Sequence, residues 1–387
     1  MIHRGIATFG LDTGVCPKWL FERMVKLGRE MVRIIVEDYS PDEFVARIAD
    51  PVWFQSLGTV LAFDWNASGL TTILTAALKE AIRGNERNLG LFICGGKGAT
   101  SKKTPDQIQE WGERLYLPTN GVKNLVYNSK MAAKVDSALV QDGFQLYHHA
   151  FFFTVNKNKI GSWTVVQQGM NTAKATARRY HWHSAKITDL VCEPHCGIVS
   201  PIKTPTLDLS AKASAETRKT STELVQGNYQ GLMKDVQILR RHSSDLSQMV
   251  SLKLKGGEQL TLLNLETKEF DFHPVVNEDF SKSKYLEKVL FTVCEEKPKD
   301  YEKLLSLSGV GPKTMRALSL VAEVIYGAKP SYEDPARYSF AHGGKDGTPY
   351  PIDRLTFDKS IEFFRRIVPK MKVSDLEKRK MMGKLVK

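Results

Sequence analysis

Hydrophobic residues recur at helical spacing through most of the first ninety residues. Between Pro17 and Ile35 the large apolar side chains fall three or four positions apart, which places them on one side of a helix. Ser40, Pro41 and Glu43 have the residue types of a helix start, namely an N-cap, a first-turn proline and the acid of a capping box. The pattern predicts several amphipathic helices after a short extended start.

Strand-like patterns begin near residue 89. Residues 89–94 form a short apolar run that is typical of a buried strand. Residues 144–169 contain two apolar runs around a polar turn at 156–161, which predicts a β-hairpin. The alternation of inward and outward positions breaks down at the three phenylalanines 151–153, so we expect both faces of that strand to be buried.

A glycine-rich segment, Gly-Gly-Lys-Gly at 95–98, directly follows the first predicted strand. A loop of this kind between a strand and a helix has the outline of a phosphate-binding loop. It lacks the Walker pattern, since Leu91 stands where the first glycine belongs and a glycine replaces the Ser or Thr that holds magnesium. We therefore expect no nucleotide cofactor. Two interpretations of this segment stay open. In one, Lys97, Lys102 and Lys103 contact a nucleic-acid strand, and in the other the segment is an ordinary surface loop.

Two helical runs near the C-terminus, 301–307 and 313–326, flank a glycine bend at 309–312. The glycines allow a tight turn and a close approach to the backbone, and the N–H groups at the start of the second helix favour an anion. The pattern predicts a helix-hairpin-helix that binds nucleic-acid phosphates, the alternative being an ordinary hairpin that packs on its leucines. The nucleic-acid-binding residues predicted here are Gly309, Gly311, Lys313, Thr314 and Arg316.

The patterns together predict an α+β fold. A mixed N-terminal α/β region, with a sheet that contains the β-hairpin, is followed by a helical C-terminal region with the helix-hairpin-helix. We divide the chain into an α/β domain at 1–200 that holds the chemistry, a helical connecting region at 201–280, and the helix-hairpin-helix region at 281–387. Within the connecting region, residues 213–254 are predicted to be largely helical, with a polar amphipathic pattern.

The charge of the chain favours a polyanionic partner. There are 55 Lys and Arg residues against 43 Asp and Glu, a formal net charge of +12. Residues 354–387 hold eleven of the basic and four of the acidic residues, which makes the C-terminus a basic arm that we expect beside the bend. Such a block is often only a solvated helix, but next to a phosphate-binding motif it favours backbone contact with DNA or RNA. We expect DNA, double- or single-stranded.

Cysteine usage and hydropathy indicate the compartment. Five cysteines, odd in number and mostly isolated, argue against a disulfide framework and fit a reducing compartment. No apolar run approaches the ~20 residues of a membrane span, and the N-terminus lacks the apolar region of a signal peptide. We expect a cytoplasmic protein that has no membrane partner.

Polar residues around the predicted β-hairpin form a second candidate site. Asp136, Asp142, His149 and Gln168 lie in or beside segments that we expect to be buried, where polar groups need partners. One hypothesis is a metal-dependent phosphodiesterase in which Asp136 and Asp142 hold Mg²⁺ or Mn²⁺ and His149 assists the attacking water. An acid before one strand and a polar pair on the next is an order that distantly resembles that of restriction-type nucleases. Residues 168–170, however, lack the acid and the lysine that those enzymes have at this place. The alternative is a hydrogen-bond network that orders the hairpin.

Basic and aromatic residues alternate at 178–183. On a strand, Tyr180 and Trp182 share one face and Arg179 lies on the other. These aromatic rings are candidates for stacking on an unpaired base, with Arg179 meeting phosphates, and core aromatics are the alternative. A zinc site is not favoured because the Cys-x-x-x-Cys spacing is looser than that of a zinc knuckle. The residues considered for zinc are His181, His183, Cys192 and Cys196.

Several short motifs are spread over most of the chain. They are Arg4-Gly5-Ile6-Ala7, Pro17-Lys18-Trp19-Leu20-Phe21, Asp64-Trp65, Gly95-Gly96-Lys97-Gly98, Gln141-Asp142-Gly143, Gln167-Gln168-Gly169-Met170-Asn171, Arg179-Tyr180-His181-Trp182 and His342-Gly343-Gly344-Lys345-Asp346-Gly347. The last motif lies in a long glycine loop, to which we assign Lys345 as a nucleic-acid-binding residue because such a loop suggests function. Together the motifs resemble the archaeal and bacterial family catalogued as domain of unknown function 763. The resemblance brings no established chemistry with it.

Residues 307–314 are similar to the hairpin of the endonuclease III type of DNA glycosylase. The resemblance implies that Lys313 attacks the sugar C1′ and that an Asp about eighteen residues further on assists. Residue 331 is Ser, so Asp353 takes that role only if the glycine loop is an insertion. The iron–sulfur cysteines of that family are absent.

Three hypotheses follow. The first is a DNA-processing enzyme of the repair type, a nuclease whose N-terminal region holds the chemistry while the bend and the basic arm hold the strand. The second is a base-excision glycosylase or abasic-site lyase that uses Lys313 with Asp353. The third is a DNA-binding protein without catalytic activity.

Overall fold

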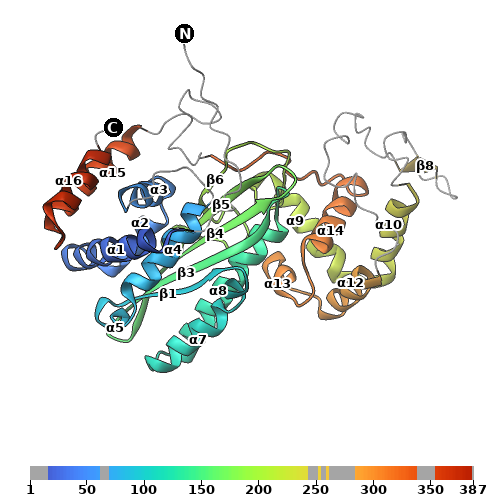
Figure 1. Cartoon of the computed structure of the whole chain (residues 1–387). Helices are drawn as coiled ribbons and strands as arrows, with labels where there is room; N and C mark the ends of the chain where they lie inside the picture. The colour runs from blue at the N-terminus through green and yellow to red at the C-terminus, as the bar shows by residue number, and fades with distance from the viewer. Residues whose placement is uncertain are drawn as a thin grey trace, which may run out of the picture.

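The computed structural model describes residues 16–61, 69–242, 252–253, 259–260, 284–337 and 354–385. Its centre is a five-stranded antiparallel sheet with helices packed on both faces (Figure 1). The strand order is β1-β3-β4-β5-β6. These strands are β1 (Leu91–Lys97), β3 (Gln145–Asn156), β4 (Lys159–Asn171), β5 (Thr176–His183) and β6 (His195–Val199).

One face of the sheet is covered by N-terminal helices and by two helices from the C-terminus. Ile93, Phe152 and Val166 project from the strands into this layer and share a hydrophobic cluster with the helices. Side chains of Ser40 and Asp50 accept backbone N–H bonds at the helix starts, as the sequence predicts for Ser40. The helices are α1 (Lys18–Asp38), α2 (Pro41–Ile48), α3 (Pro51–Val60), α4 (Gly69–Ile82), α15 (Arg354–Ile367) and α16 (Asp375–Lys384).

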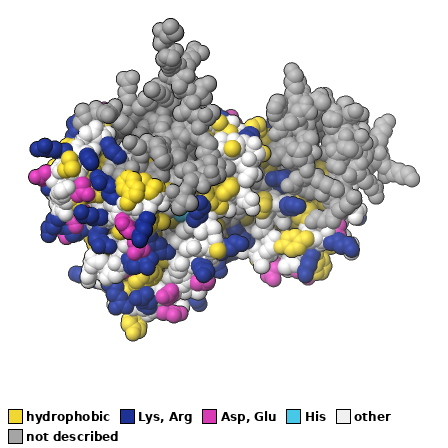
Figure 2. Space-filling view, viewed as in Figure 1, with side chains coloured by type: hydrophobic (Ala, Val, Ile, Leu, Met, Phe, Trp, Pro, Cys, Tyr) yellow, Lys and Arg dark blue, Asp and Glu magenta, His cyan; other side chains and the backbone are white. Residues whose placement is uncertain are grey.

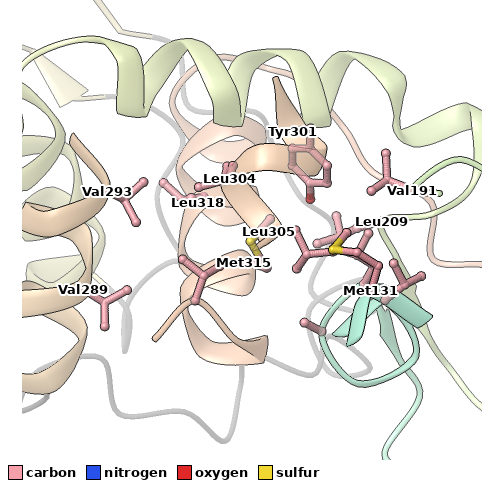
Figure 3. Packing of buried hydrophobic residues seen from close by; sticks show 14 of the residues in the cluster. Met131, Val191, Leu209, Val289, Val293, Tyr301, Leu304, Leu305, Met315 and Leu318 are labelled. Atoms are coloured by element: carbon pink, nitrogen blue, oxygen red, sulfur yellow. The ribbon is translucent and has the colours of Figure 1, made fainter. Parts of the chain in front are cut away.

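The opposite face is covered by α8 and, beyond it, by the later helices. Phe151, Phe153 and Val165 project into this layer, in a hydrophobic cluster that runs on into the C-terminal helices. Figure 3 shows Leu304 and Leu305 of one of these helices close to Leu318 and Met315 of the next. The helices are α7 (Thr104–Arg114), α8 (Thr119–Ala138), α9 (Ala215–Gln226), α10 (Tyr229–His242), α12 (Lys284–Glu296), α13 (Tyr301–Ser306) and α14 (Pro312–Val324).

The predicted fold class is confirmed, because the chain combines an antiparallel sheet with a helical C-terminal part. The β-hairpin is present as β3 and β4, and it turns tightly at Lys157 and Asn158, whose φ values are +47° and +61°. The triple phenylalanine behaves as expected, since Phe152 packs on one layer while Phe151 and Phe153 pack on the other.

The predicted loop after residue 94 is wrong. The first strand continues through the glycines to Lys97, because Gly95, Gly96 and Lys97 pair with Ala150, His149 and His148 of β3. A short helix, α6 (Ala99–Lys102), follows at once, and α7 begins two residues later. The glycine-rich segment is therefore an edge strand and a helix start, and Lys97, Lys102 and Lys103 are exposed there.

The largely helical character predicted for 213–254 is confirmed over residues 215–242, but the end of the predicted segment is not helical. The helical part divides into α9 and α10, which are separated at Gly227 and Asn228. Residues 252–253 form a short strand, β8, that pairs with β9 at residues 259–260. The division into three domains remains a prediction, although one hydrophobic cluster joins strands β1, β3 and β4 to helices α8 to α14.

The basic C-terminal block does not lie beside the glycine bend. Phe363, Phe364 and Met381 of α15 and α16 pack in the cluster of the N-terminal helices, whereas the bend belongs to the cluster on the other face of the sheet. Figure 1 shows these two helices at the opposite end of the molecule from α13 and α14. The prediction that the basic block lies beside the bend relied on their closeness in sequence and is wrong. Residues 338–353, which are not among the described residues, separate the two regions of the chain.

None of the helices within the described ranges is long and apolar enough to cross a membrane. The Lys and Arg side chains on the face seen in Figure 2 are spread over several elements and do not form one basic patch. On this face, the net positive charge therefore does not by itself locate a binding surface.

Gly95 is a position where the fold requires glycine. Its φ is +87°, and a Cβ would lie 2.2 Å from the carbonyl oxygen of His149 and 2.4 Å from Thr104 Oγ1. Gly98 has a φ of +61°, but its Cβ would meet nothing within 4 Å. We expect Gly95→Ala to lower the free energy of unfolding by more than about 2 kcal/mol, and Gly98→Ala by about 1 kcal/mol. Urea denaturation of both variants measures this difference, and equal losses would contradict it.

Candidate functional site

The glycine bend joins α13 to α14. Gly309 has a φ of +82°, and Val310 is buried under the bend, while Gly309 itself is exposed. A Cβ at Gly309 would lie 3.1 Å from Val289 Cγ2 of α12. The conformation and the close packing both explain the glycine at this position.

Helix α14 starts with backbone N–H groups directed away from the helix body. Gly311 is the N-cap, Pro312 has no N–H, and the first helical bond runs from the Met315 N–H to the Gly311 carbonyl, at 3.0 Å. The N–H groups of Lys313 and Thr314 therefore precede the hydrogen-bond ladder of the helix. No side chain of the described residues caps this end. Such a helix start favours an anion.

Gly311 differs from Gly309 in a way that matters for function. Its φ is −152°, a value that any residue adopts, and a Cβ there would meet nothing within 4 Å. Neither backbone strain nor packing requires glycine at this position. The absence of a side chain instead keeps the surface before the N–H groups of Lys313 and Thr314 open.

The bend is anchored to α8 by a lysine ammonium. Lys134 Nζ donates to the carbonyl oxygens of Leu305 and Leu307, at 2.7 and 2.6 Å. These carbonyls lie at the C-terminal end of α13, where a positive charge is favourable. Burial lowers the pKa of Lys134 from its ordinary value, which is the cost of placing an ammonium under the bend.

A second anchor comes from the short strand β2 (Val140–Gln141). Gln141 Nε2 donates to the Pro312 carbonyl at 3.0 Å, and the Gln141 side-chain oxygen accepts a bond from Arg316 Nε. Arg316 was predicted to reach phosphates, but this bond holds it against the protein. Of the other predicted side chains, Lys313 is exposed and Thr314 is buried.

Asp136, a predicted catalytic and metal-binding residue, lies fully buried on α8. Its carboxylate accepts bonds from Gln167 Nε2 at 2.5 Å, from Trp182 Nε1 at 3.1 and 3.2 Å, and from His195 Nε2 at 2.5 Å. Burial raises the pKa of Asp136, and these donors oppose the rise. The partners come from three different strands, so the carboxylate has one fixed orientation.

His149 continues the same network. Its Nδ1 lies 2.7 Å from Gln167 Oε1, and its Nε2 lies 2.9 Å from Ser129 Oγ. Since the amide of Gln167 donates to Asp136, its oxygen accepts from His149 Nδ1–H, which leaves His149 Nε2 to accept from Ser129. Burial lowers the pKa of His149 to about 4. The ring is therefore neutral at pH 7.

Asp142 belongs to a separate group of residues. Its carboxylate accepts bonds from Arg178 at 3.0 Å, from the Tyr180 hydroxyl at 2.6 Å and from the Phe144 N–H at 3.0 Å. Arg178 also donates to Asp334 at 2.7 Å. Burial raises the pKa of Asp142, and the Arg178 guanidinium opposes that rise. This cluster joins β5 to the segment that follows α14.

The structure does not bring Asp136 and Asp142 together as a metal site. Each carboxylate is occupied by its own donors, and the described residues contain no group of three or more His, Cys, Asp or Glu side chains arranged to hold a metal ion. Of the residues considered for zinc, His181 is fully buried, with Nδ1 3.1 Å from the Ile48 carbonyl. The hydrogen-bond network that was the alternative interpretation matches the contacts around Asp136.

The basic and aromatic residues of β5 are not available for stacking on a base. Tyr180 and Trp182 share one face and Arg179 lies on the other, as predicted, but all three have 0% exposure. Arg179 Nε donates to His181 Nε2 at 2.8 Å, and its guanidinium lies over the Phe54 ring. Gln168 is likewise fully buried, with Nε2 2.5 Å from the Tyr147 hydroxyl. The sequence pattern indicated binding, whereas the structure places these residues in the core.

The end of β1 lines a pocket of about 650 Å³ together with α4. Lys97 lies at this pocket with Lys79, which the sequence did not single out. Lys79 Nζ donates to the Gly95 carbonyl at 2.9 Å and to Gln107 Oε1 at 2.8 Å, so it holds the glycine segment in place. Lys345 and Asp353, also predicted as site residues, lie outside the described residues.

Sequence reasoning also missed His195. It lies at the start of β6, beside Asp136, and lines a pocket of about 500 Å³. Neither the neighbouring cysteines nor local hydrophobic spacing marked it, because its partner lies 59 positions earlier in the chain. A buried acid and a histidine that is distant in sequence can be recognised as a pair only when the tertiary fold is known.

Comparison with known proteins gives a family. The model of the family described as "Protein of unknown function (DUF763)" matches residues 5–352. The chain belongs to this family. No curated protein and no solved structure matched the DUF763 chain at the significance required. The suspected family is thus confirmed, and the function rests on the geometry of the chain itself.

The buried histidine of the network predicts a pH dependence of stability. An unfolded histidine titrates near pH 6.5, and the folded His149 near 4, so between these values only the unfolded state gains this proton. His149 thus stabilises the fold above pH 6.5, and the free energy of unfolding falls by about 3 kcal/mol as the pH drops to 4. Urea denaturation between pH 7.5 and 4.5 should show a smaller loss in His149→Gln than in the wild type. An identical loss would contradict this assignment.

Proposed function

We propose that this protein binds the sugar–phosphate backbone of a nucleic acid at the bend between α13 and α14, as part of a nucleic-acid-processing activity of the DNA repair type. The observation that carries the proposal is Gly311. The fold itself does not require glycine there, whereas close approach of a phosphate to the N–H groups of Lys313 and Thr314 does.

The charges around the bend support the same assignment. Lys313 is exposed in the first turn of α14, and Lys134 places an ammonium under the bend. Lys130 lies one turn before Lys134 on α8 and is also exposed. Each lysine that contacts a phosphate displaces a counterion, so binding of this kind weakens with salt.

The rigidity of the bend also supports binding. Lys134 fixes the C-terminal end of α13, and Gln141 fixes the carbonyl of Pro312. The N–H groups of α14 are therefore held in position before a ligand arrives. A preorganised donor set loses little conformational entropy on binding, which raises affinity.

The enzymatic part of the proposal is a nuclease. The version with a metal held by Asp136 and Asp142 has no support from the geometry, because the two carboxylates lie in separate networks. The lyase alternative rests on Lys313, whose side chain is exposed beside the bend.

The two glycines of the bend make a matched pair for mutagenesis. We expect Gly311→Ala to leave stability unchanged and to weaken binding of a fluorescent 20-nucleotide DNA roughly tenfold, because its methyl group obstructs a charge-assisted contact of ~1.5 kcal/mol. We expect Gly309→Ala to destabilise the fold by ~1 kcal/mol, because its φ is +82°. Fluorescence anisotropy and urea denaturation measure the two effects.

The proposal fails if the wild type does not bind single- or double-stranded DNA, or RNA, at low salt. It also fails if Gly311→Ala binds as tightly as the wild type. Gly383→Ala is a suitable control, since Gly383 lies in α16, at the other end of the molecule, and a Cβ there meets nothing within 4 Å.

Lys313 allows binding and lyase chemistry to be separated. If it contacts one phosphate, Lys313→Ala should reduce the slope of log affinity against log salt by about 1, with all sequences affected alike. The lyase hypothesis instead predicts that borohydride traps the wild type covalently on abasic-site DNA, and that Lys313→Ala abolishes the trapping. If Lys313→Ala reduces the salt slope and no trapping occurs, Lys313 binds a phosphate but is not a lyase nucleophile. If the slope is unchanged, Lys313 does not contact a phosphate.

A further inference from the structure

A pocket with a volume of about 500 Å³ is lined by β6 and by the segment after α14. Its walls include Ile198, Ala211 and Pro335, and its polar groups include His195, Asp208 and Ser210. Asp208 belongs to the short strand β7 (Leu207–Asp208), and its carboxylate accepts bonds from the N–H and hydroxyl of Ser210. The volume falls within the range of small-molecule sites.

His195 forms a fixed pair with a buried carboxylate. Its Nε2 lies 2.5 Å from Asp136 Oδ1, and Trp182 and Gln167 also donate to that carboxylate. The Trp182 ring also packs edge-on against the imidazole, with centroids 4.9 Å apart. The carboxylate accepts the Nε2–H, so Nδ1 is the ring nitrogen that remains to act as a base.

This arrangement is more than a satisfied core histidine. The side chain of His195 keeps 8% exposure and lines the pocket, whereas that of Asp136 has none. An imidazole that is oriented by a buried acid and lines an accessible pocket is the arrangement of a general base. Burial raises the pKa of the neighbouring Cys196 thiol to about 11, so Cys196 stays protonated and is a poor nucleophile.

Charged residues of both signs line the pocket. Lys203, Lys212 and Arg337 are exposed there, with Glu193 and Glu333 as the exposed acids, and Asp208 and Asp334 add two less exposed carboxylates. Lys212 and Glu193 form an ion pair at 3.4 Å. The net charge of the lining therefore does not by itself select the class of substrate.

We propose that His195 is the general base of a hydrolytic site in this pocket, and that its substrate is a phosphodiester. The choice of a phosphodiester rests on the proposed nucleic-acid binding at the bend, while the assignment of the base rests on the Asp136–His195 geometry. Asp136 is a positioning residue, which fixes the tautomer and the orientation of the ring.

The reaction balances with water alone. A water O–H bond breaks as the proton moves to His195 Nδ1, and the water oxygen forms a bond to phosphorus. The bond between phosphorus and the leaving alkoxide breaks, and the alkoxide takes a proton from the imidazolium. The products are a phosphate monoester and an alcohol, and His195 returns to its neutral form.

The test uses the full-length protein with bis(p-nitrophenyl) phosphate, a small diester that does not need the bend, and with labelled DNA and RNA oligonucleotides. Reactions contain Mg²⁺ or Mn²⁺, with a parallel set in chelator. We expect wild-type hydrolysis to fall at least about 100-fold in His195→Gln and at least about tenfold in Asp136→Asn. His183→Gln is the matched control, because that ring lies on the other face of β5, and it should retain the wild-type rate.

A second measurement separates catalysis from folding. Added imidazole should restore part of the activity of His195→Gly, which it would not do for a residue that only supports the structure. Absence of hydrolysis of every diester by the wild type, or an unchanged rate in His195→Gln, would overturn the inference. If DNA still binds in that case, the proposed function at the bend stands. Loss of DNA binding with hydrolysis of the small diester intact would instead contradict only the proposed function.

Discussion

The position of α8 between the sheet and the C-terminal helices is the constraint on which both candidate sites depend. One side of this helix presents Asp136 to Trp182 and Gln167 of the sheet. Another side presents Lys134 to the carbonyls at the end of α13. The hydrophobic cluster around Met131, Ala132 and Val135 fixes the helix, and therefore fixes both polar contacts. A shift of α8 would disturb the bend and the His195 pocket together.

The two sites differ in their physical demands. At the bend, the ligand is expected to meet open backbone N–H groups and exposed lysines, so affinity comes from electrostatics and falls with salt. In the pocket, a buried carboxylate orients one imidazole, so the expected contribution is to rate. Because Asp136 is fully enclosed, burial raises the pKa of its carboxyl, and the hydrogen bonds from its partners oppose that rise.

Much of the fold could be predicted from local patterns, and the candidate site only in part. Helix starts such as Ser40, the β-hairpin and the burial of Phe151 to Phe153 follow from spacing within a few residues. The glycine segment at 95–98 misled the prediction, because pairing with β3 extends the strand through residues that usually end one. Arg179, Tyr180 and Trp182 misled it further, since the same residue types serve a buried polar core and a nucleic-acid surface. The pair of Asp136 and His195 needed the tertiary fold, as no pattern links residues on α8 and β6.

The most direct test of the account is the response of individual amide signals to a nucleic acid. In a ¹H–¹⁵N NMR titration with a short oligonucleotide at low salt, the signals of Lys313 and Thr314 should shift with a common affinity and return as salt is added. Signals of α15 and α16 should shift less, because these helices lie at the opposite end of the molecule. If the oligonucleotide shifts other signals while those of Lys313 and Thr314 stay unchanged, the bend is not the binding site and the account is wrong.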